Sequence, residues 1–484
     1  MERALMIGRE AELALLQRRL NSPVSEFVAV YGRRGVGKTY LVHQLLGERP
    51  DFEYTGSCRA GARVQLKQFH AALKRRGGGD TKIPQSWFEA FSELKQYLLG
   101  LGKDKVVVFL DELPWMATAK SSFKAALAYF WNGWNSNRTL LKLVACGSSI
   151  TWMTDKLLGD PGGLYGRVSR AIYLAPFTLR ETELYLNEVK GLHYGREQVL
   201  ECYLSLGGIP YYLEQLKAGK SLEHNLGALF GTGHSPLGEE FEFLYRSLFR
   251  NSNKYLKVVE YLARSLSGRS REEIARACRL TGGELSILAK LCKEDFLRAF
   301  LVPYKKERGR IYHLCDQLSL FYLSQVKAER SSAANFRMSI SQSDPKEAWA
   351  DYAFTQVCLQ HLPQIRQALG ITGVLSKVYA WSVPAPKDET GSVSSATQPA
   401  LIIDRADSVM NFCEMKYSHD EYGIDTASER SLRERMAQFR RSVSGKKTVR
   451  CTLITPYGVR QDEHSALVAA QVLLDDLFCE VKPL

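Results

Sequence analysis

The chain has 484 residues, of which 45% are hydrophobic and 24% charged, so it can form two to four packed domains rather than a disordered chain. Its formal net charge of +13 favours a polyanionic partner, nucleic acid first, with a merely solvated basic surface as the alternative. Ten scattered cysteines without a CxxC pair, and no apolar run long enough to cross a bilayer, exclude a disulfide framework and a membrane partner. We expect a soluble, cytoplasmic protein.

The first predicted strand, residues 27–31, runs into the segment GRRGVGKT at residues 32–39 and then into a helix. A glycine-rich loop between a strand and a helix is the context of a P-loop, whose backbone N–H groups surround a polyphosphate. The expected nucleotide-binding positions are Gly32, Gly35, Gly37, Lys38 and Thr39. Lys38 should reach the outer phosphates and Thr39 should offer its hydroxyl to Mg²⁺. The alternative is a glycine-rich turn without a ligand.

A second strand of this kind, residues 106–110, is wholly apolar and ends at Asp111-Glu112. Such a run is typical of a central parallel strand, and ligands of open α/β sheets bind where these strands end. Asp111 is therefore predicted to hold Mg²⁺, directly or through water, and Glu112 to orient or deprotonate the attacking water. An acidic turn without this role is the alternative.

Two weaker candidates follow in the alternating strand and helix pattern of residues 1–175, which predicts a doubly wound parallel sheet. The strand at residues 140–146 precedes Ser148, which can present a hydroxyl beside the γ-phosphate. The glycine-rich loop at residues 162–167 carries Arg167, which can neutralise γ-phosphate charge in its own or a neighbouring subunit. The alternative for Arg167 is a plain surface arginine.

The pattern becomes helical over residues 176–250, as in a lid over a nucleotide, and changes again over residues 251–330. There, three predicted helices precede a hairpin whose loop is the basic run at residues 305–309, an order that resembles a winged helix. The third helix carries Lys290 and Lys293 but little that reads base edges, so phosphate contact is more plausible than sequence-specific recognition. A packing role is the alternative.

The last domain, residues 345–484, follows a polar connection and contains a second polar loop near residues 384–399. Its predicted order is helix, strand, hairpin, helix, strand, helix. Alternation along the second hairpin strand places Glu414 and Lys416 on one face, a carboxylate for Mg²⁺ beside an ammonium group. An arginine-rich helix at residues 429–444 offers a basic face for a phosphate backbone, or is simply solvated.

Taken together, these segments resemble the bacterial and archaeal AAA+/STAND-type ATPases that carry a winged helix and a C-terminal domain of the PD-(D/E)xK nuclease fold. The resemblance covers nearly the whole chain. The motifs that carry it are Ile7-Gly8-Arg9-Glu10, the P-loop, Leu110-Asp111-Glu112-Leu113-Pro114-Trp115, Phe130-Trp131-Asn132-Gly133-Trp134, Cys146-Gly147-Ser148, Gly207-Gly208-Ile209-Pro210, Cys413-Glu414-Met415-Lys416 and Leu453-Ile454-Thr455-Pro456-Tyr457-Gly458. The resemblance implies ATPase roles for Lys38, Thr39, Asp111 and Glu112, a sensor role for Ser148 and an arginine finger at Arg167.

The chain departs from this resemblance in the nuclease signature. Thr355 stands where the family has an acidic residue in the first helix, and Ala400 stands where it has an aspartate. With a turn centred between residues 406 and 407, residue 399 would face Glu414, and Asp404 would lie about 16 Å further along the strand. Because a carboxylate ligand must lie within about 2–2.6 Å of a divalent ion, Asp404 cannot substitute. We therefore expect a nuclease remnant.

The resulting prediction is an α/β protein: a P-loop ATPase core (residues 1–175), a helical lid (176–250), a winged helix and connector (251–330) and a restriction-endonuclease-like α/β domain (345–484). It should bind and hydrolyse ATP with Mg²⁺ and couple this to DNA binding. A signalling switch that does not act on DNA, and an active Mg²⁺-dependent nuclease, are the alternatives. A homo-oligomer is left open.

Overall fold

A computed structural model describes residues 6–46, 50–79, 82–134, 137–231, 235–265, 268–301, 310–327, 344–381, 400–443 and 447–481. The chain forms two compact units. The first comprises Met1–Pro176 and Ile209–Tyr211, and the second comprises Phe177–Gly208 and Tyr212–Leu484. The basic loop predicted at residues 305–309, and nearly all of the two polar loops predicted near residues 330–345 and 384–399, lie outside the described residues.

The first unit is built on a five-stranded sheet in the order β2-β3-β4-β1-β5 with all neighbours parallel. The strands are β1 (Glu26–Tyr31), β2 (Phe52–Thr55), β3 (Lys105–Asp111), β4 (Leu140–Gly147) and β5 (Arg170–Tyr173). The apolar runs expected to form central strands are buried in β1, β3 and β4, because helices cover both faces of the sheet. This confirms the predicted α/β class.

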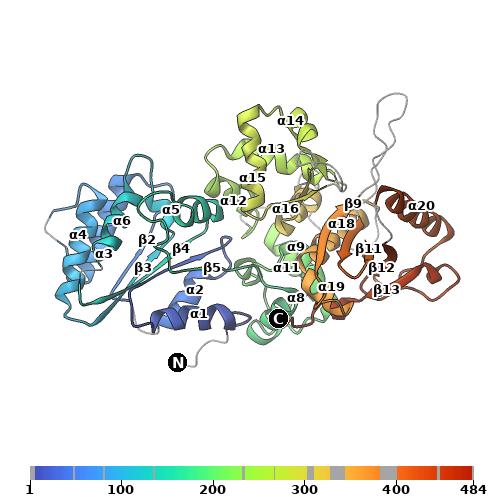
Figure 1. The fold of residues 1–484 in the computed structure, drawn as a ribbon, viewed down its shortest axis with the longest axis horizontal. Coiled ribbons are helices and arrows are strands. Elements are labelled where there is room, and N and C mark those ends of the chain that lie inside the picture. Colours follow the sequence, from blue (N-terminus) through green and yellow to red (C-terminus); the bar gives the residue numbers. More distant parts are fainter. Residues whose placement is uncertain are drawn as a thin grey trace. The chain divides into compact units, whose positions relative to one another are not determined.

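Helices lie on the two sides of this sheet (Figure 1). They are α1 (Glu10–Leu20), α2 (Lys38–Leu46), α3 (Ala62–Arg75), α4 (Trp87–Gly100), α5 (Leu113–Met116), α6 (Phe123–Asn132) and α7 (Ile150–Trp152), the last continued by the π-helical turn Met153–Leu158. An aromatic cluster that includes Phe69, Trp87 and Phe123 packs α3, α4 and α6 together over the sheet. This core holds the strand ends in fixed positions.

The second unit begins with short helices. They are α8 (Leu179–Leu184, continued by the π-helical turn Tyr185–Val189), α9 (Arg196–Leu206), the end of α10 (Pro210–Leu213), α11 (Leu222–Phe230) and α12 (Glu240–Leu248). Thr178 and Glu181 form a capping box that starts α8, because each satisfies a backbone N–H at the helix end.

Three helices and a three-stranded antiparallel sheet follow in the second unit. The elements are α13 (Ser252–Ala263), β6 (Arg269–Ser270), α14 (Arg271–Cys278), a 3₁₀ turn (Gly282–Leu285), α15 (Ser286–Lys293), β7 (Leu297–Leu301) and β8 (Arg310–Leu314), with the sheet order β6-β8-β7. Ser270 caps α14, because its side chain accepts from the Glu273 N–H. After them, α16 (Gln317–Phe321) continues as a π-helical turn, Tyr322–Val326.

The C-terminal part of the second unit contains a five-stranded mixed sheet in the order β13-β12-β11-β10-β9. Its elements are α18 (Asp344–Gln360), α19 (Leu362–Ala368), β9 (Ser376–Trp381), β10 (Ala400–Arg405), β11 (Val409–Met415), α20 (Thr426–Ser442), β12 (Thr448–Ile454), a 3₁₀ turn (Ser465–Leu467), β13 (Val468–Val472) and α21 (Leu474–Leu477). The predicted order omitted β13. Its alanine-rich sequence favours a helix, but parallel pairing with β12 overrides that local preference.

His361 joins α8 to the end of α18 inside the second unit. Its Nε2 accepts a hydrogen bond from the Leu179 N–H at 2.9 Å, and its Nδ1 lies 2.8 Å from the Val357 carbonyl. Both contacts are satisfied by the neutral ring with the proton on Nδ1. Burial lowers the pKa of His361 to about 4.

We expect this ring to make the second unit sensitive to acid. The folded state resists protonation, so stability from His361 is present above the unfolded-state pKa of about 6.5 and is lost as pH falls toward 4. Urea unfolding of the wild type and of His361→Gln should therefore show a stability difference that shrinks by about 3 kcal/mol between pH 7 and pH 4. A difference that stays constant with pH would contradict this assignment.

None of the helices in the described part of the chain combines the length and the apolarity that a membrane span requires. All ten cysteines lie among the described residues, and no disulfide joins any of them.

Candidate functional site

The predicted P-loop connects β1 to α2 at the edge of the sheet where the parallel strands end. Lys38 opens α2, and only 5% of its surface is exposed. Its ammonium group donates to the carbonyl oxygens of Gly32 at 3.0 Å and of Arg33 at 2.8 Å. The loop therefore curls around its own lysine.

Three glycines make this curled path sterically accessible, and each has a positive φ. A Cβ at Gly32 would lie 2.3 Å from the carbonyl oxygen of Leu174, and one at Gly35 would lie 2.7 Å from Cβ of Tyr211. A Cβ at Gly37 would meet no atom within 4 Å. The loop is thus packed on one side and open at Gly37, where a phosphate group can approach.

The sequence did not predict that Tyr211, which follows the glycine-rich segment at residues 207–210, contacts the P-loop. The Tyr211 N–H donates to the carbonyl of Gly35 at 3.1 Å, within the first unit. The predicted lid motif Gly207-Gly208-Ile209-Pro210 is therefore divided, because Ile209–Tyr211 belongs to the first compact unit and Gly208 to the second.

Asp111 and Thr39 meet although 72 positions separate them. The Thr39 hydroxyl donates to Oδ2 of Asp111 at 2.9 Å. Strand β4 lies between β1 and β3, so the ends of three parallel strands bring the P-loop and the acidic pair to one edge. This is the juxtaposition that the sequence motifs predicted.

Glu112 is held by Ser148 at the end of β4. The backbone N–H of Ser148 donates to Oε2 of Glu112 at 3.1 Å, and the Ser148 hydroxyl donates to Oε1. Glu112 has a φ of 50°, a left-handed conformation that is unusual for glutamate and common at functional sites. In this structure the Ser148 hydroxyl therefore orients the carboxylate of Glu112.

The pKa shifts of Lys38 and Asp111 indicate that the site can bind charged ligands. Burial lowers the pKa of Lys38, and burial followed by the charge of Glu112 raises the pKa of Asp111. Both shifts disfavour the ionised side chain in the protein alone. A polyphosphate beside Lys38 and a divalent cation beside Asp111 would supply the missing opposite charges, so the residues fit the cofactors that the sequence predicts.

Arg167 does not lie near the carboxyl ends of the strands, where the P-loop and the acidic pair meet. It precedes β5, whose first residue, Arg170, pairs with Val28 of β1. The P-loop begins after the opposite end of β1, and a six-residue strand is about 20 Å long. The exposed Arg167 side chain cannot span that distance to the P-loop of its own subunit, so a role toward a neighbouring subunit and a plain surface arginine are the two interpretations that remain.

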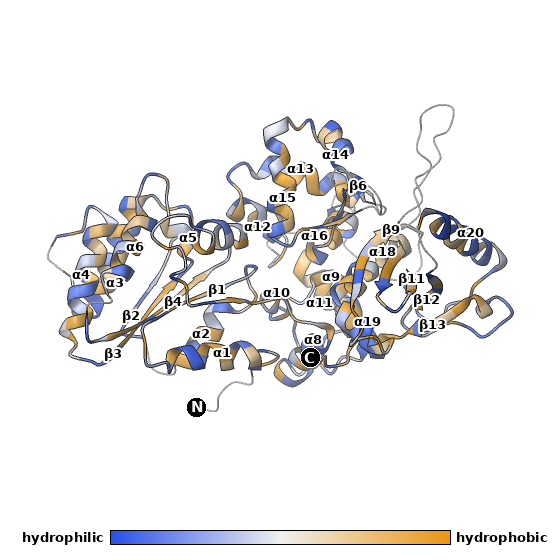
Figure 2. Cartoon of the chain, viewed as in Figure 1, coloured by the Kyte–Doolittle hydropathy of each residue, from blue (hydrophilic) through white to orange (hydrophobic). Residues whose placement is uncertain are grey.

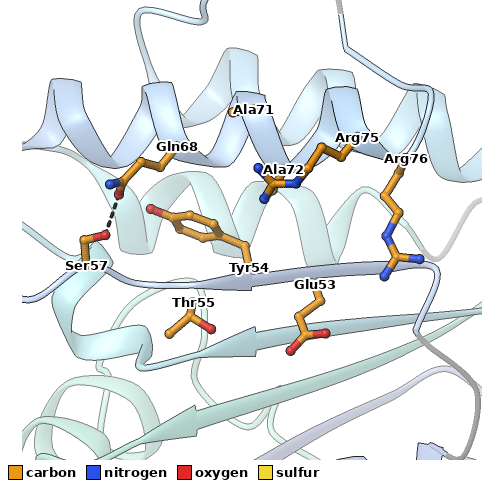
Figure 3. A pocket seen from close by; sticks show the side chains of 9 residues that line it. All are labelled: Glu53, Tyr54, Thr55, Ser57, Gln68, Ala71, Ala72, Arg75 and Arg76. Carbon is orange, nitrogen blue, oxygen red and sulfur yellow. Dashed lines mark hydrogen bonds between the residues drawn. The ribbon is translucent and has the colours of Figure 1, made fainter.

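A pocket of about 740 Å³ lies between the edge strand β2 and α3 (Figure 3). The Arg76 guanidinium lies at one end of it, the hydrogen-bonded pair Ser57 and Gln68 lies at the other, and the Arg75 guanidinium lies between them. No motif in the sequence marks these residues as a site. Their only sequence signal is a pair of arginines at the end of a helix.

The C-terminal sheet brings Glu414 and Lys416 to one face of β11, and each has a partner that the sequence analysis missed. Arg435 of α20 donates from Nη1 to Oε1 of Glu414 at 2.8 Å. Nζ of Lys416 lies 3.1 Å from Oδ2 of Asp351, whose Oδ1 accepts the Tyr417 N–H at 2.6 Å. Asp351 lies one turn before Thr355 on α18 and could have been found from that spacing.

The strand register corrects one step of the prediction. Leu401 pairs with Cys413 and Asp404 with Met410, so Ala400, rather than residue 399, is in register with Glu414. The hairpin turn is one residue longer than assumed, with Ser408 in a left-handed conformation. Asp404 remains distant from Glu414 and instead binds Lys447 of the neighbouring chain segment.

The arginine-rich helix α20 is less available than its composition suggests, although it is strongly hydrophilic (Figure 2). Arg430 pairs with Glu434 at 3.0 Å, and Arg433 pairs with Glu429 at 2.6 Å. Arg435 is buried against Glu414. These partners neutralise much of the basic face that the sequence predicted.

Comparisons with known proteins agree with the geometry of the first unit. Residues 6–216 match the model of a family described as an ATPase domain predominantly from Archaea. An uncharacterised protein of Methanocaldococcus jannaschii is 26% identical over 326 residues, which cover 66% of this chain and 69% of that protein. Residues 6–216 are therefore similar to the archaeal ATPase domain, and the chain is an ATPase.

Two solved structures are similar over about two thirds of the chain. The Walker-type ATPase of Pyrococcus abyssi matches with 19% identity and a TM-score of 0.45, over 66% of this chain and 96% of its own. The ORC2 protein of Aeropyrum pernix matches with 14% identity and a TM-score of 0.42, over 68% of this chain and 96% of its own.

Proposed function

We propose that this chain is a cytoplasmic protein that uses ATP binding and hydrolysis to control DNA binding by its second unit, and that its nuclease-like domain no longer cuts DNA. The observation that carries the ATPase part is the pair of contacts Thr39–Asp111 and Ser148–Glu112, which gather two carboxylates beside the P-loop. ATP would supply the phosphoanhydride bond, and Mg²⁺ would supply positive charge at its oxygens.

Each residue of the site then has one role. Lys38 and the loop N–H groups bind the phosphates, and Thr39 with Asp111 holds the metal ion. Glu112 orients the attacking water and accepts its proton. Ser148 acts as the sensor by fixing the carboxylate of Glu112, so that its effect on hydrolysis is indirect.

A homo-oligomer is part of the proposal, because Arg167 lies too far from its own P-loop to serve it. An arginine finger in this position would act on the nucleotide of a neighbouring subunit. The proposed domains remain residues 1–175, 176–250, 251–330 and 345–484.

For DNA binding, we favour the region at residues 251–330 over α20. Three helices and the sheet β6-β8-β7 occur in the order of a winged helix, and Lys290 and Lys293 are exposed on its third helix, α15. These lysines suit phosphate contact without sequence readout. The arginines of α20 contribute less because glutamates pair with three of them.

The test is ATP hydrolysis with and without duplex DNA, repeated over a range of ionic strength. We expect DNA to stimulate turnover, and its affinity to fall about a thousandfold between 50 and 200 mM salt if some six phosphates are neutralised. The matched variant Lys290→Ala/Lys293→Ala should lower DNA affinity and leave basal hydrolysis unchanged. Hydrolysis indifferent to DNA, with nucleotide retained through purification, would instead identify a signalling switch.

A further inference from the structure

The face of β11 that carries Glu414 lacks the ligands that a divalent cation needs. Ala400 is in register with Glu414, and Asp404 is bound to Lys447. The nearest carboxylate on α18, that of Asp351, is already occupied by Lys416 and the Tyr417 N–H. Hard divalent cations require several oxygen ligands, and the described residues leave only Glu414 for this purpose. The residues therefore do not fit the metal ion that the nuclease resemblance implies.

The guanidinium group of Arg435 neutralises the negative charge of Glu414, a role that the nuclease resemblance assigns to a metal ion. The side chains of Arg435 and Glu414 are 11% and 9% exposed, and they form an ion pair at 2.8 Å. A metal ion can dissociate, whereas Arg435 is covalently attached and stays protonated at any accessible pH. The positive charge at this face is thus permanent and independent of metal concentration.

A cavity of about 460 Å³ opens beside this ion pair, which is within the size range of small-molecule sites. Its charged lining consists of Lys416, Arg435 and Glu414, while Asp351, the partner of Lys416, is not part of the lining. The hydroxyl groups of Ser428 and Ser431 come from the first turns of the 17-residue helix α20. Ammonium, guanidinium, hydroxyl groups and a helix N-terminus all favour a phosphate oxygen.

Two further observations indicate which chemical groups the ligand must carry. Asp351, which does not line the cavity, pairs with the ammonium group of Lys416 and restricts its position, and the Lys416 side chain is 27% exposed. Oε2 of Glu414 is buried at the cavity and accepts no hydrogen bond from any residue that the structure describes. A ligand that satisfies this oxygen must carry a donor, such as a sugar hydroxyl or a base amino group, near its phosphate.

We propose that this cavity binds a nucleotide unit without a metal ion, with Lys416 contacting the phosphate and Arg435 providing the fixed charge that a metal ion would otherwise supply. The nucleotide comes either from a nucleic acid strand or from a free mononucleotide, since both have the same chemistry. The choice of duplex DNA as one probe rests on the proposed function. The mononucleotide arm does not depend on it.

The experiment uses the full-length chain carrying Lys38→Ala, so that the P-loop does not compete for the mononucleotide. Binding of a fluorescent DNA duplex is measured by anisotropy and binding of AMP by calorimetry, each in Mg²⁺ and in EDTA. We expect equal affinity in both buffers, and about a tenfold loss with Lys416→Ala, the effect of one lost hydrogen bond to a charged group. Lys447→Ala, a lysine with its own aspartate partner outside the cavity, is the matched control.

The two arms identify the source of the nucleotide. A loss confined to DNA assigns a nucleic acid strand, and a loss for AMP assigns a free nucleotide. Glu414→Gln can still accept from Arg435 but loses the acceptor at Oε2, so it should weaken binding equally in Mg²⁺ and in EDTA, whereas loss of a metal ligand would weaken binding in Mg²⁺ alone. The proposal is overturned if binding of both probes requires Mg²⁺, if neither probe binds, or if Lys416→Ala behaves like Lys447→Ala. DNA-independent ATP hydrolysis would refute the proposed function and leave AMP binding intact.

Discussion

Replacing Glu112 by glutamine is expected to leave ATP binding intact and to slow hydrolysis by about 100- to 10,000-fold, the range contributed by a general base. Glutamine has nearly the same shape; its amide oxygen can still accept from the Ser148 N–H, and its NH2 group can donate to the Ser148 hydroxyl oxygen. What the variant loses is the ability to accept a proton from water. Single-turnover hydrolysis together with equilibrium ATP binding separates the two effects.

Glu53→Gln is the matched control for this experiment. Glu53 lies on the neighbouring strand β2 and binds His43 at 3.0 Å rather than the P-loop face. We expect this variant to hydrolyse ATP at the parental rate. Full activity of Glu112→Gln, or equal losses in both variants, would show that the base lies elsewhere.

The second large effect is expected from Lys38→Ala, which should weaken ATP binding by at least about 100-fold. A hydrogen bond to a charged group contributes about 1.5–3 kcal/mol, and Lys38 can donate several to the phosphates. Calorimetry with ATP measures this directly. Lys105→Ala, at the exposed opposite end of β3, should bind ATP normally.

Lys38→Ala should have little effect on folding, which distinguishes a binding role from a structural one. Burial lowers the pKa of Lys38, which means that the charged side chain lowers the stability of the fold when no nucleotide is bound. Lys38→Met keeps the volume of the buried stem and should reproduce the loss of binding. An affinity retained by both variants would remove Lys38 from the nucleotide site.

The ATPase site could be predicted from the sequence because its parts are local. The P-loop is a continuous segment between a strand and a helix, and Asp111-Glu112 directly follows a wholly apolar strand. Parallel strands in an open sheet end at the same edge, so these two segments had to meet there. Thr39 bonded to Asp111 is the result.

The contacts of the C-terminal cavity could not be predicted in the same way. Arg435 is one of several arginines on α20, and no local pattern separates it from Arg433, which is exposed and paired on the helix surface. The partner of Lys416 is Asp351, 65 positions away on α18. A register error of one residue also moved the position facing Glu414, because turn length was inferred without the paired strands.

The amino-acid sequence by itself determined the α/β class and placed the P-loop and the acidic pair at the ends of parallel strands, since hydrophobic periodicity and short motifs encode elements within a few residues of one another. The tertiary structure alone decided that Ser148 holds Glu112, that Arg167 lies at the far end of the sheet, and that Arg435 neutralises Glu414. Each of these depends on the pairing of strands or the packing of a helix from distant parts of the chain. Such long-range contacts are set by the burial of whole elements, and no local pattern specifies them.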